Sequence, residues 1–145
     1  MSIKAGDRIP SGTLKHKTSD GVTDISTEQL FSGKKVVVFA VPGAFTPTCS
    51  AKHLPGFVAK AAEIKAKGVD TIACVSVNDA FVMNAWARDL EIKNVKMIPD
   101  GCGTFTRSMG MLVNKPAQGF GMRSWRYAAV IKNGIVENWF EEPGL

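Results

Sequence analysis

Two short apolar runs place the strongest constraint on the fold of this 145-residue chain. They are Val36–Ala40 and Thr71–Val77, which are rich in β-branched residues and carry no charged side chain. Continuous apolar strands of this kind are typical of a parallel sheet that is covered on both faces. Between them, Ser50–Lys67 has apolar residues spaced by three and four, which predicts a helix that ends at Gly68. Pro55 is expected to kink or restart that helix near its first turns.

The rest of the chain contains further helices and strands in an alternating order. Each is marked by a capping signal or by a short apolar stretch. In chain order these elements are a short helix opened by the capping box of Ser26 and Gln29 and ending at Phe31, a helix capped by Asn78 or Asp79 and ending near Leu90, a strand at Val95–Ile98 and a helix around Thr104–Met109.

A turn signal completes the fold prediction. Asn133-Gly134 separates two apolar strands, Trp125–Lys132 and Ile135–Phe140, and this dipeptide is the strongest short-range signal for a β-hairpin. The whole pattern predicts an α/β fold with a central mixed sheet flanked by helices and a C-terminal β-hairpin. A thioredoxin-like arrangement fits this order, although the order alone does not single it out.

Composition excludes several classes of function. The 18 Lys and Arg residues are scattered among 13 Asp and Glu residues, so the net charge of +5 indicates a solvated surface rather than a nucleic-acid site. No apolar run approaches the ~20 residues of a membrane span. The first residues also lack the apolar core of a signal peptide. We therefore expect one domain over residues 1–145, located in the cytoplasm and without a membrane partner.

The cysteines direct attention to thiol chemistry. Three cysteines, separated by 25 and 28 residues, form neither a disulfide framework nor a Cys-x-x-Cys motif, and we expect no metal site. The first, Cys49, ends the segment Val41–Cys49, which runs from a buried strand into a helical pattern. A thiol at a helix N-terminus ionises below its free pKa of about 8.5, because the helix dipole favours an anion there. Cys49 is therefore predicted to be a redox or nucleophilic residue.

The neighbours of Cys49 favour this interpretation over a packing role, which is the commoner fate of a free cysteine. Thr46 lies three residues upstream and can present its hydroxyl to the sulfur from the same turn. Pro42 and Pro47 fix the loop and remove two backbone donors from it. A plain strand-to-helix connection needs none of these residues.

A second candidate site residue, Arg126, lies in an apolar strand near the end of the chain. Both faces of Trp125–Ile131 are mostly apolar, so a buried guanidinium there is costly unless an anion pairs with it. That anion is either a structural carboxylate or the Cys49 thiolate together with a polar substrate. Arg123, three residues earlier, is expected at the surface end of the strand.

An ordered series of motifs covers nearly the whole chain. Pro42, Thr46 and Cys49 fit the pattern Pro-x-x-x-Thr/Ser-x-x-Cys. Through this series the chain resembles the peroxiredoxins, specifically the type II or peroxiredoxin-5 subfamily, from about Gly6 to Pro143. The further matching segments are His53-Leu54-Pro55-Gly56-Phe57, Ser76-Val77-Asn78-Asp79-Ala80-Phe81-Val82-Met83, Pro99-Asp100-Gly101 and Gly119-Phe120-Gly121-Met122-Arg123-Ser124-Trp125-Arg126-Tyr127.

The resemblance implies a thiol-dependent peroxidase on a thioredoxin-like fold, acting on hydrogen peroxide and alkyl hydroperoxides in antioxidant defence and redox homeostasis. Cys49 matches the peroxidatic cysteine, which becomes a sulfenic acid. Thr46 and Pro42 match its loop partners, and Arg126 matches the arginine of the site. Glutaredoxin with glutathione, or thioredoxin, is the implied reductant, and no metal or organic cofactor is needed.

The resemblance also bears on recycling and assembly. Cys74 matches the resolving cysteine of some plant type II members, but it lies in mid-strand, so a structural role is equally compatible with its position. Similar proteins form homodimers through an edge around Phe45, Phe81 and the loop near Phe120, and we expect the same here. Relatives continue beyond the equivalent of Glu142–Gly144 with a final helix, which this chain is expected to lack.

Two other functions remain as alternatives. A thiol–disulfide oxidoreductase of thioredoxin type would use the same fold, but Thr46-Pro47-Thr48-Cys49 lacks the first cysteine of a Cys-x-x-Cys pair. A non-catalytic redox sensor would use Cys49 to switch its assembly, without rapid turnover of peroxide.

Overall fold

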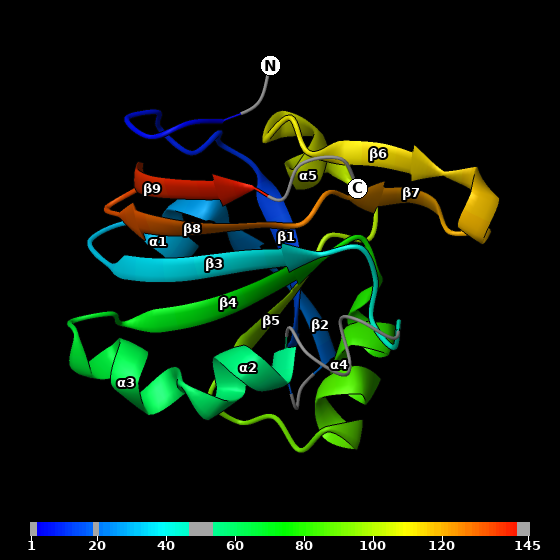
Figure 1. Cartoon of the computed structure of the whole chain (residues 1–145), viewed down its shortest axis with the longest axis horizontal. Coiled ribbons are helices and arrows are strands. Elements are labelled where there is room, and N and C mark those ends of the chain that lie inside the picture. The colour runs from blue at the N-terminus through cyan, green and yellow to red at the C-terminus, as the bar shows by residue number, and fades with distance from the viewer. Residues whose placement is uncertain (1–2, 19–20, 47–53, 142–145) are drawn as a thin grey trace.

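A five-stranded mixed sheet forms the centre of the molecule (Figure 1). The computed structural model describes residues 3–18, 21–46 and 54–141. The strand order is β5-β4-β3-β8-β9, with β4 and β5 parallel to β3, and with antiparallel pairing of β8 to β3 and of β9 to β8. The two apolar runs thus lie side by side as predicted. The strands are β3 (Lys35–Val41), β4 (Thr71–Ser76), β5 (Lys96–Pro99), β8 (Tyr127–Lys132) and β9 (Ile135–Glu141).

Helices cover both faces of this sheet, as the sequence predicts. On one face, α1 (Thr27–Phe31) and α5 (Thr104–Ser108) pack on a core that includes Val36 and Val38. On the other face, the core around Phe39 and Cys74 is covered by three helices. These are α2 (Leu54–Ala59), α3 (Ala61–Ala66) and α4 (Ala80–Asp89). Figure 1 shows α2 and α3 in front of the sheet and α1 behind it.

The predicted helix caps are present, and the helical region after β3 is divided into two helices. Ser26 and Gln29 form the full capping box of α1, and the Asp79 side chain caps α4 by accepting from the Val82 N–H at 2.8 Å. Pro55 is the second residue of α2, where a missing N–H costs no helical hydrogen bond, and the residues that precede α2 lie outside the described part of the chain, so the expected kink or restart at Pro55 stays a prediction. A further interruption, which the sequence did not predict, falls at Lys60 between α2 and α3.

The C-terminal hairpin is confirmed, with one boundary moved. Asn133 and Gly134 have φ values of 50° and 79°, the positive values that a two-residue type I′ turn requires. The predicted strand Trp125–Lys132 begins only at Tyr127, because Trp125 and Arg126 connect it to a separate short strand. That strand, β7 (Gly121–Ser124), forms a hairpin with β6 (Leu112–Lys115) through the 3-10 turn η2 (Pro116–Gln118).

A second hairpin near the N-terminus is also absent from the sequence prediction. It pairs β1 (Thr13–Thr18) with β2 (Gly21–Ser26) in antiparallel register and packs beside β5. Within the described segments, no helix combines the length and the apolar character needed to cross a lipid bilayer.

Candidate active site

The site is built on the loop that leaves the carboxyl end of β3. Val41, Pro42 and Gly43 are buried, and the chain then turns outward through Ala44, Phe45 and Thr46. Cys49 and Pro47 lie outside the described residues, as do all residues from 47 to 53. The structure therefore describes the platform from which the chain continues toward Cys49.

Asn78, which follows the neighbouring strand β4, holds this loop in place. Its Oδ1 atom accepts the Ala44 N–H at 2.9 Å and the Ser76 hydroxyl at 2.5 Å. Parallel strands end at the same edge of the sheet, so residues that follow β3 and β4 meet there. The arrangement fixes the backbone of the loop before the chain reaches Cys49.

Phe45 stores local strain in the same loop. Its φ of +64° lies in the left-handed region, which costs a non-glycine residue about 1–2 kcal/mol. The ring is 50% exposed, and its centroid lies 6.4 Å from that of Trp86 on α4. Residues held in such conformations are concentrated at functional sites, where the surrounding structure fixes them.

Thr46 directs its hydroxyl back into the loop. The Thr46 hydroxyl donates a hydrogen bond of 2.7 Å to the Gly43 carbonyl oxygen. Because the hydroxyl proton is used in this bond, the oxygen keeps lone pairs that can accept a hydrogen bond from a substrate. Thr46 is therefore set up as an acceptor at the last described position of the loop.

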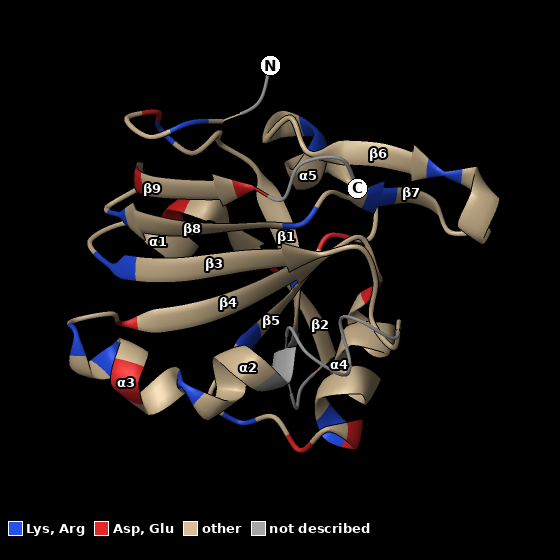
Figure 2. Ribbon diagram, in the orientation of Figure 1, with Lys and Arg blue, Asp and Glu red and all other residues tan. Residues whose placement is uncertain are grey.

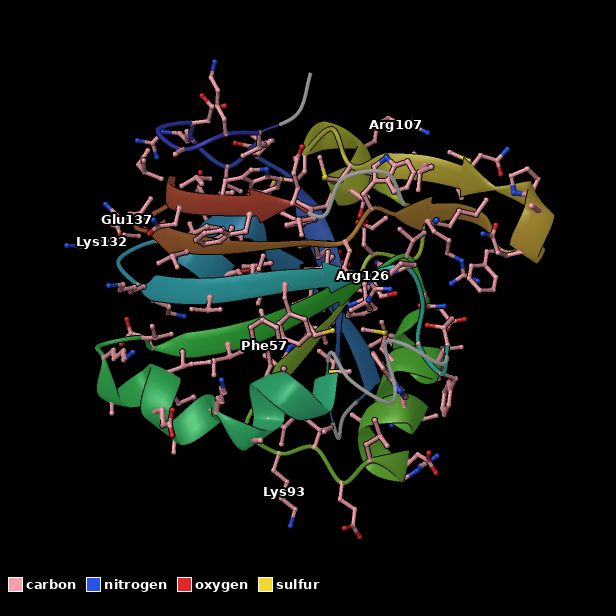
Figure 3. The ribbon with its side chains drawn as sticks, viewed as in Figure 1. Phe57, Lys93, Arg107, Arg126, Lys132 and Glu137 are labelled. Atoms are coloured by element: carbon pink, nitrogen blue, oxygen red, sulfur yellow. The ribbon has the colours of Figure 1, made fainter. Side chains whose placement is uncertain are left out.

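Arg126 lies at the same end of the sheet as the Thr46 loop. It is half-buried and directly precedes β8, and Tyr127 pairs with Ala40 across the sheet, so Arg126 lies opposite Val41. Figure 3 shows Arg126 near the end of β3, with Lys132 at the far end of β8. The structure thus places Pro42, Thr46 and Arg126 at the carboxyl end of β3, while Cys49, on which the sequence hypothesis centres, lies outside the described residues.

Arg123 corrects the sequence analysis. It was expected at the surface end of the Arg126 strand, but it belongs to β7 and its side chain is half-buried. Its Nε donates to the Phe120 carbonyl at 3.1 Å and its Nη1 to the Val77 carbonyl at 3.3 Å. The same guanidinium packs on the backbone of Gly43. No signal in the sequence connects these segments, because only the tertiary fold brings them together.

Cys74 is fully buried in the middle of β4. It is paired with Phe39 of β3 on one side and with Met97 of β5 on the other. A disulfide between Cys74 and any exposed thiol would therefore need the strand to open locally. Cys102, in contrast, is exposed in the loop before α5.

Tyr127, next to Arg126, carries an unusual buried hydroxyl. Within the described residues this oxygen has no hydrogen-bond partner, and the residue is 3% exposed. Burial raises the pKa of Tyr127 far above its usual value, and the nearby Asp100 and Cys74 raise it further. The Tyr127 phenol is thus neutral in the folded chain.

Comparison with known proteins shows which proteins this chain is similar to. The Redoxin family profile matches residues 4–144. A peroxiredoxin of Rhizobium etli is 62% identical over 122 residues, which cover 84% of this chain and 68% of that protein. The hybrid peroxiredoxin hyPrx5 of Haemophilus influenzae is 52% identical over 143 residues, covering 99% of this chain and 59% of that protein. The chain thus spans 59–68% of the length of these two curated relatives.

Solved structures show the same relationship in three dimensions. Reduced Prx3 of Vibrio vulnificus in complex with hydrogen peroxide aligns with a TM-score of 0.94 at 47% identity, over 99% of this chain and 90% of that one. Peroxiredoxin 5 of Alvinella pompejana aligns with a TM-score of 0.88 at 32% identity, over 97% and 90% of the two chains.

Proposed function

This chain belongs to the peroxiredoxins, a family of thiol peroxidases with a thioredoxin-like fold, and is similar to their peroxiredoxin-5 subfamily; we propose that it reduces hydrogen peroxide and alkyl hydroperoxides through Cys49. The observation that best supports this proposal is the assembly of Pro42, Thr46 and Arg126 at the carboxyl end of β3. Three residues after Thr46 the sequence places the only cysteine of this loop.

The proposed reaction is a two-electron oxidation of the Cys49 sulfur. The thiolate attacks the terminal peroxide oxygen, the O–O bond breaks, and Cys49 becomes a sulfenic acid. The other oxygen leaves as hydroxide or alkoxide and takes a proton from solvent water, which gives water or an alcohol. The sulfur is oxidised and the peroxide is reduced, so no external electron donor is needed in this step.

The surrounding residues stabilise the charges of this step. Thr46 accepts a hydrogen bond from the peroxide O–H, since its own proton is engaged by Gly43. The Arg126 guanidinium favours the thiolate and the negative charge that develops on the leaving oxygen. Pro42, buried at the base of the loop, offers no backbone donor to compete for the substrate.

A thiol reductant returns Cys49 to the reduced state in the proposed cycle. Glutaredoxin with glutathione, or thioredoxin, is the reductant that we propose. Cys74 remains a candidate resolving cysteine, but its burial in β4 favours a structural role and direct reduction of Cys49 by the external thiol.

We also propose that the chain forms a homodimer. Phe45 and Phe81 are 50% and 68% exposed, and large exposed aromatic side chains favour an interface. A location in the cytoplasm and the organisation of residues 1–145 as a single domain remain predictions from the sequence. Some similar peroxiredoxins are chloroplastic, such as Peroxiredoxin-2E of Arabidopsis thaliana.

Consumption of peroxide in the presence of dithiothreitol tests this function directly. Cys49→Ser is expected to abolish the activity, whereas the control Cys102→Ser changes an exposed cysteine and is expected to retain it. Activity that persists in Cys49→Ser would refute the proposal. Replacing dithiothreitol by glutaredoxin with glutathione, and then by thioredoxin, identifies the reductant.

A further inference from the structure

We propose that Arg123 is a positioning residue for the peroxidase reaction, which it supports by holding the loop that orients Thr46. This inference rests on the proposed function and adds a residue to it. Arg123 contacts the loop after β3 and the loop after β4, which are both distant from it in sequence, and the loop directly before its own strand β7. Its guanidinium therefore connects these segments at the edge of the site.

Two hydrogen bonds fix the orientation of this guanidinium. Nε donates to the Phe120 carbonyl and Nη1 donates to the Val77 carbonyl, at 3.1 and 3.3 Å. The charged group also lies over the Phe120 ring, at 5.4 Å from its centroid. Donors that point in two fixed directions are a property of the planar guanidinium, and a lysine ammonium does not reproduce them.

The third contact is with Gly43, whose lack of a side chain makes it possible. A Cβ atom built on Gly43 would lie 3.1 Å from Arg123 Nη1 and 3.0 Å from the Thr46 methyl carbon. Both distances are tighter than ordinary van der Waals contact. The guanidinium and the Thr46 methyl group therefore both fill the space that a side chain on Gly43 would occupy.

This packing lets Arg123 affect the reaction indirectly, through Gly43 and Thr46. The carbonyl oxygen of Gly43 accepts the hydroxyl proton of Thr46, so the position of that carbonyl determines where the free lone pairs of Thr46 point. Displacement of Gly43 by loss of the Arg123 contact would rotate the acceptor away from the peroxide. Arg123 thus acts on the substrate through Gly43 and Thr46, without touching it.

Two other roles for Arg123 make different predictions. A purely electrostatic role would lower the pKa of Cys49, so its loss would slow every reaction of that thiol. A purely structural role would lower thermal stability and leave the chemistry of the folded protein unchanged. A positioning role affects the reaction with peroxide, which needs the oriented acceptor, more than the reaction with a simple alkylating agent.

The experiment compares Arg123→Gln and Arg123→Lys with the exposed-arginine control Arg107→Gln, all in a Cys102→Ser background. Stopped-flow mixing gives the rate constant for hydrogen peroxide, and monobromobimane alkylation over a range of pH gives the reactivity and pKa of Cys49. Both Arg123 variants are expected to lose about tenfold to a hundredfold in the peroxide rate constant. Their alkylation rate and thiol pKa are expected to match those of the parent.

Gly43→Ala gives a second test, of the link through Gly43, that leaves Arg123 in place. The added methyl group should displace both the guanidinium and the Thr46 methyl group, so this variant should lower the peroxide rate constant in the same selective way. Its control is Gly56→Ala on α2, where an added Cβ meets no atom within 4 Å.

The outcomes separate this inference from the proposed function. Unchanged peroxide rates in the Arg123 variants, or an equal loss in the alkylation rate, would overturn the positioning role. A parent protein that itself reacts slowly with peroxide would instead refute the proposed function.

Discussion

The side-chain oxygen of Asn78 accepts the backbone N–H of Ala44 at 2.9 Å, so the residue that follows β4 fixes the loop that follows β3. The same oxygen accepts the Ser76 hydroxyl at 2.5 Å. One amide thereby satisfies two donors at the edge of the sheet. The contact connects the packed core of the parallel strands to the loop that leads to Cys49.

Asn78→Ala is expected to affect both stability and reactivity. Two donors lose their acceptor, and at a half-buried position this lowers the free energy of unfolding by about 1–2 kcal/mol. The peroxide rate constant should fall as well, because the loop backbone is less fixed. Urea denaturation and stopped-flow kinetics measure the two effects. The control Asn84→Ala, on the exposed side of α4, should change neither, and equal behaviour of the two variants would contradict the assigned role of Asn78.

Arg126→Gln tests the charge at the site. Loss of a nearby cation is expected to raise the pKa of the Cys49 thiol by about 1–3 units. The thiolate fraction at neutral pH, and with it the peroxide rate constant, should fall. The pH dependence of alkylation measures the shift. Lys132→Gln, which changes an exposed cation at the other end of β8, is the control. An unchanged thiol titration in Arg126→Gln would remove this arginine from the site.

The buried Tyr127 phenol should make the stability of the folded chain depend on pH in the alkaline range. Its pKa is raised in the folded state, chiefly by burial. Its contribution to stability is therefore fully present below the unfolded tyrosine pKa of about 10, and it is lost as the pH rises above that value. The sequence holds a single tyrosine, so tyrosinate absorbance reports this residue alone. Tyrosinate should appear only together with unfolding, and Tyr127→Phe should move the alkaline unfolding midpoint upward. Titration of Tyr127 near pH 10 in the folded protein would contradict this prediction.

Cys74→Ala separates the two roles assigned to Cys74. If the residue is structural, removing its buried sulfur lowers the free energy of unfolding by about 1 kcal/mol. Steady-state turnover with an external thiol reductant should be unchanged. A large loss of turnover with little loss of stability would instead identify Cys74 as the resolving cysteine.

Charges of both signs are distributed over the part of the chain that the structure describes. Figure 2 shows Lys and Arg distributed over several helices and strand ends, with Asp and Glu between them. Lys35 of β3 is paired with Lys132 of β8 at one end of the sheet. The Asp70 carboxylate lies at the same end, where it accepts a hydrogen bond from the Lys35 backbone N–H at 2.9 Å.

Local signals explain why much of the fold could be predicted. The apolar run that begins at Val36 fits only a strand covered on both faces, and Asn133-Gly134 fits a tight hairpin turn. The β1–β2 hairpin gave no such signal, because exposed polar residues such as Lys15 and Asp24 interrupt its short apolar stretches. Strands without an apolar period become visible only through their tertiary pairing.

Some residues of the site could likewise be predicted from the sequence, and others could not. Thr46 and Arg126 were identified because their chemistry is unusual in an apolar context and because they fit a known motif. Asn78 was assigned as one of two candidate helix caps, but Asp79 takes that role and Asn78 holds the loop. Arg123 was misplaced, because its contact with Gly43 in the loop after β3 depends on the tertiary fold and not on any local pattern.

Mass spectrometry after one equivalent of hydrogen peroxide tests the central claim most directly. The proposal predicts that the Cys49 peptide gains one oxygen atom as a sulfenic acid, which dimedone traps, while Cys74 and Cys102 remain reduced thiols. A reduced Cys49 with the oxygen distributed over other residues would contradict the claim that Cys49 is the peroxidatic cysteine.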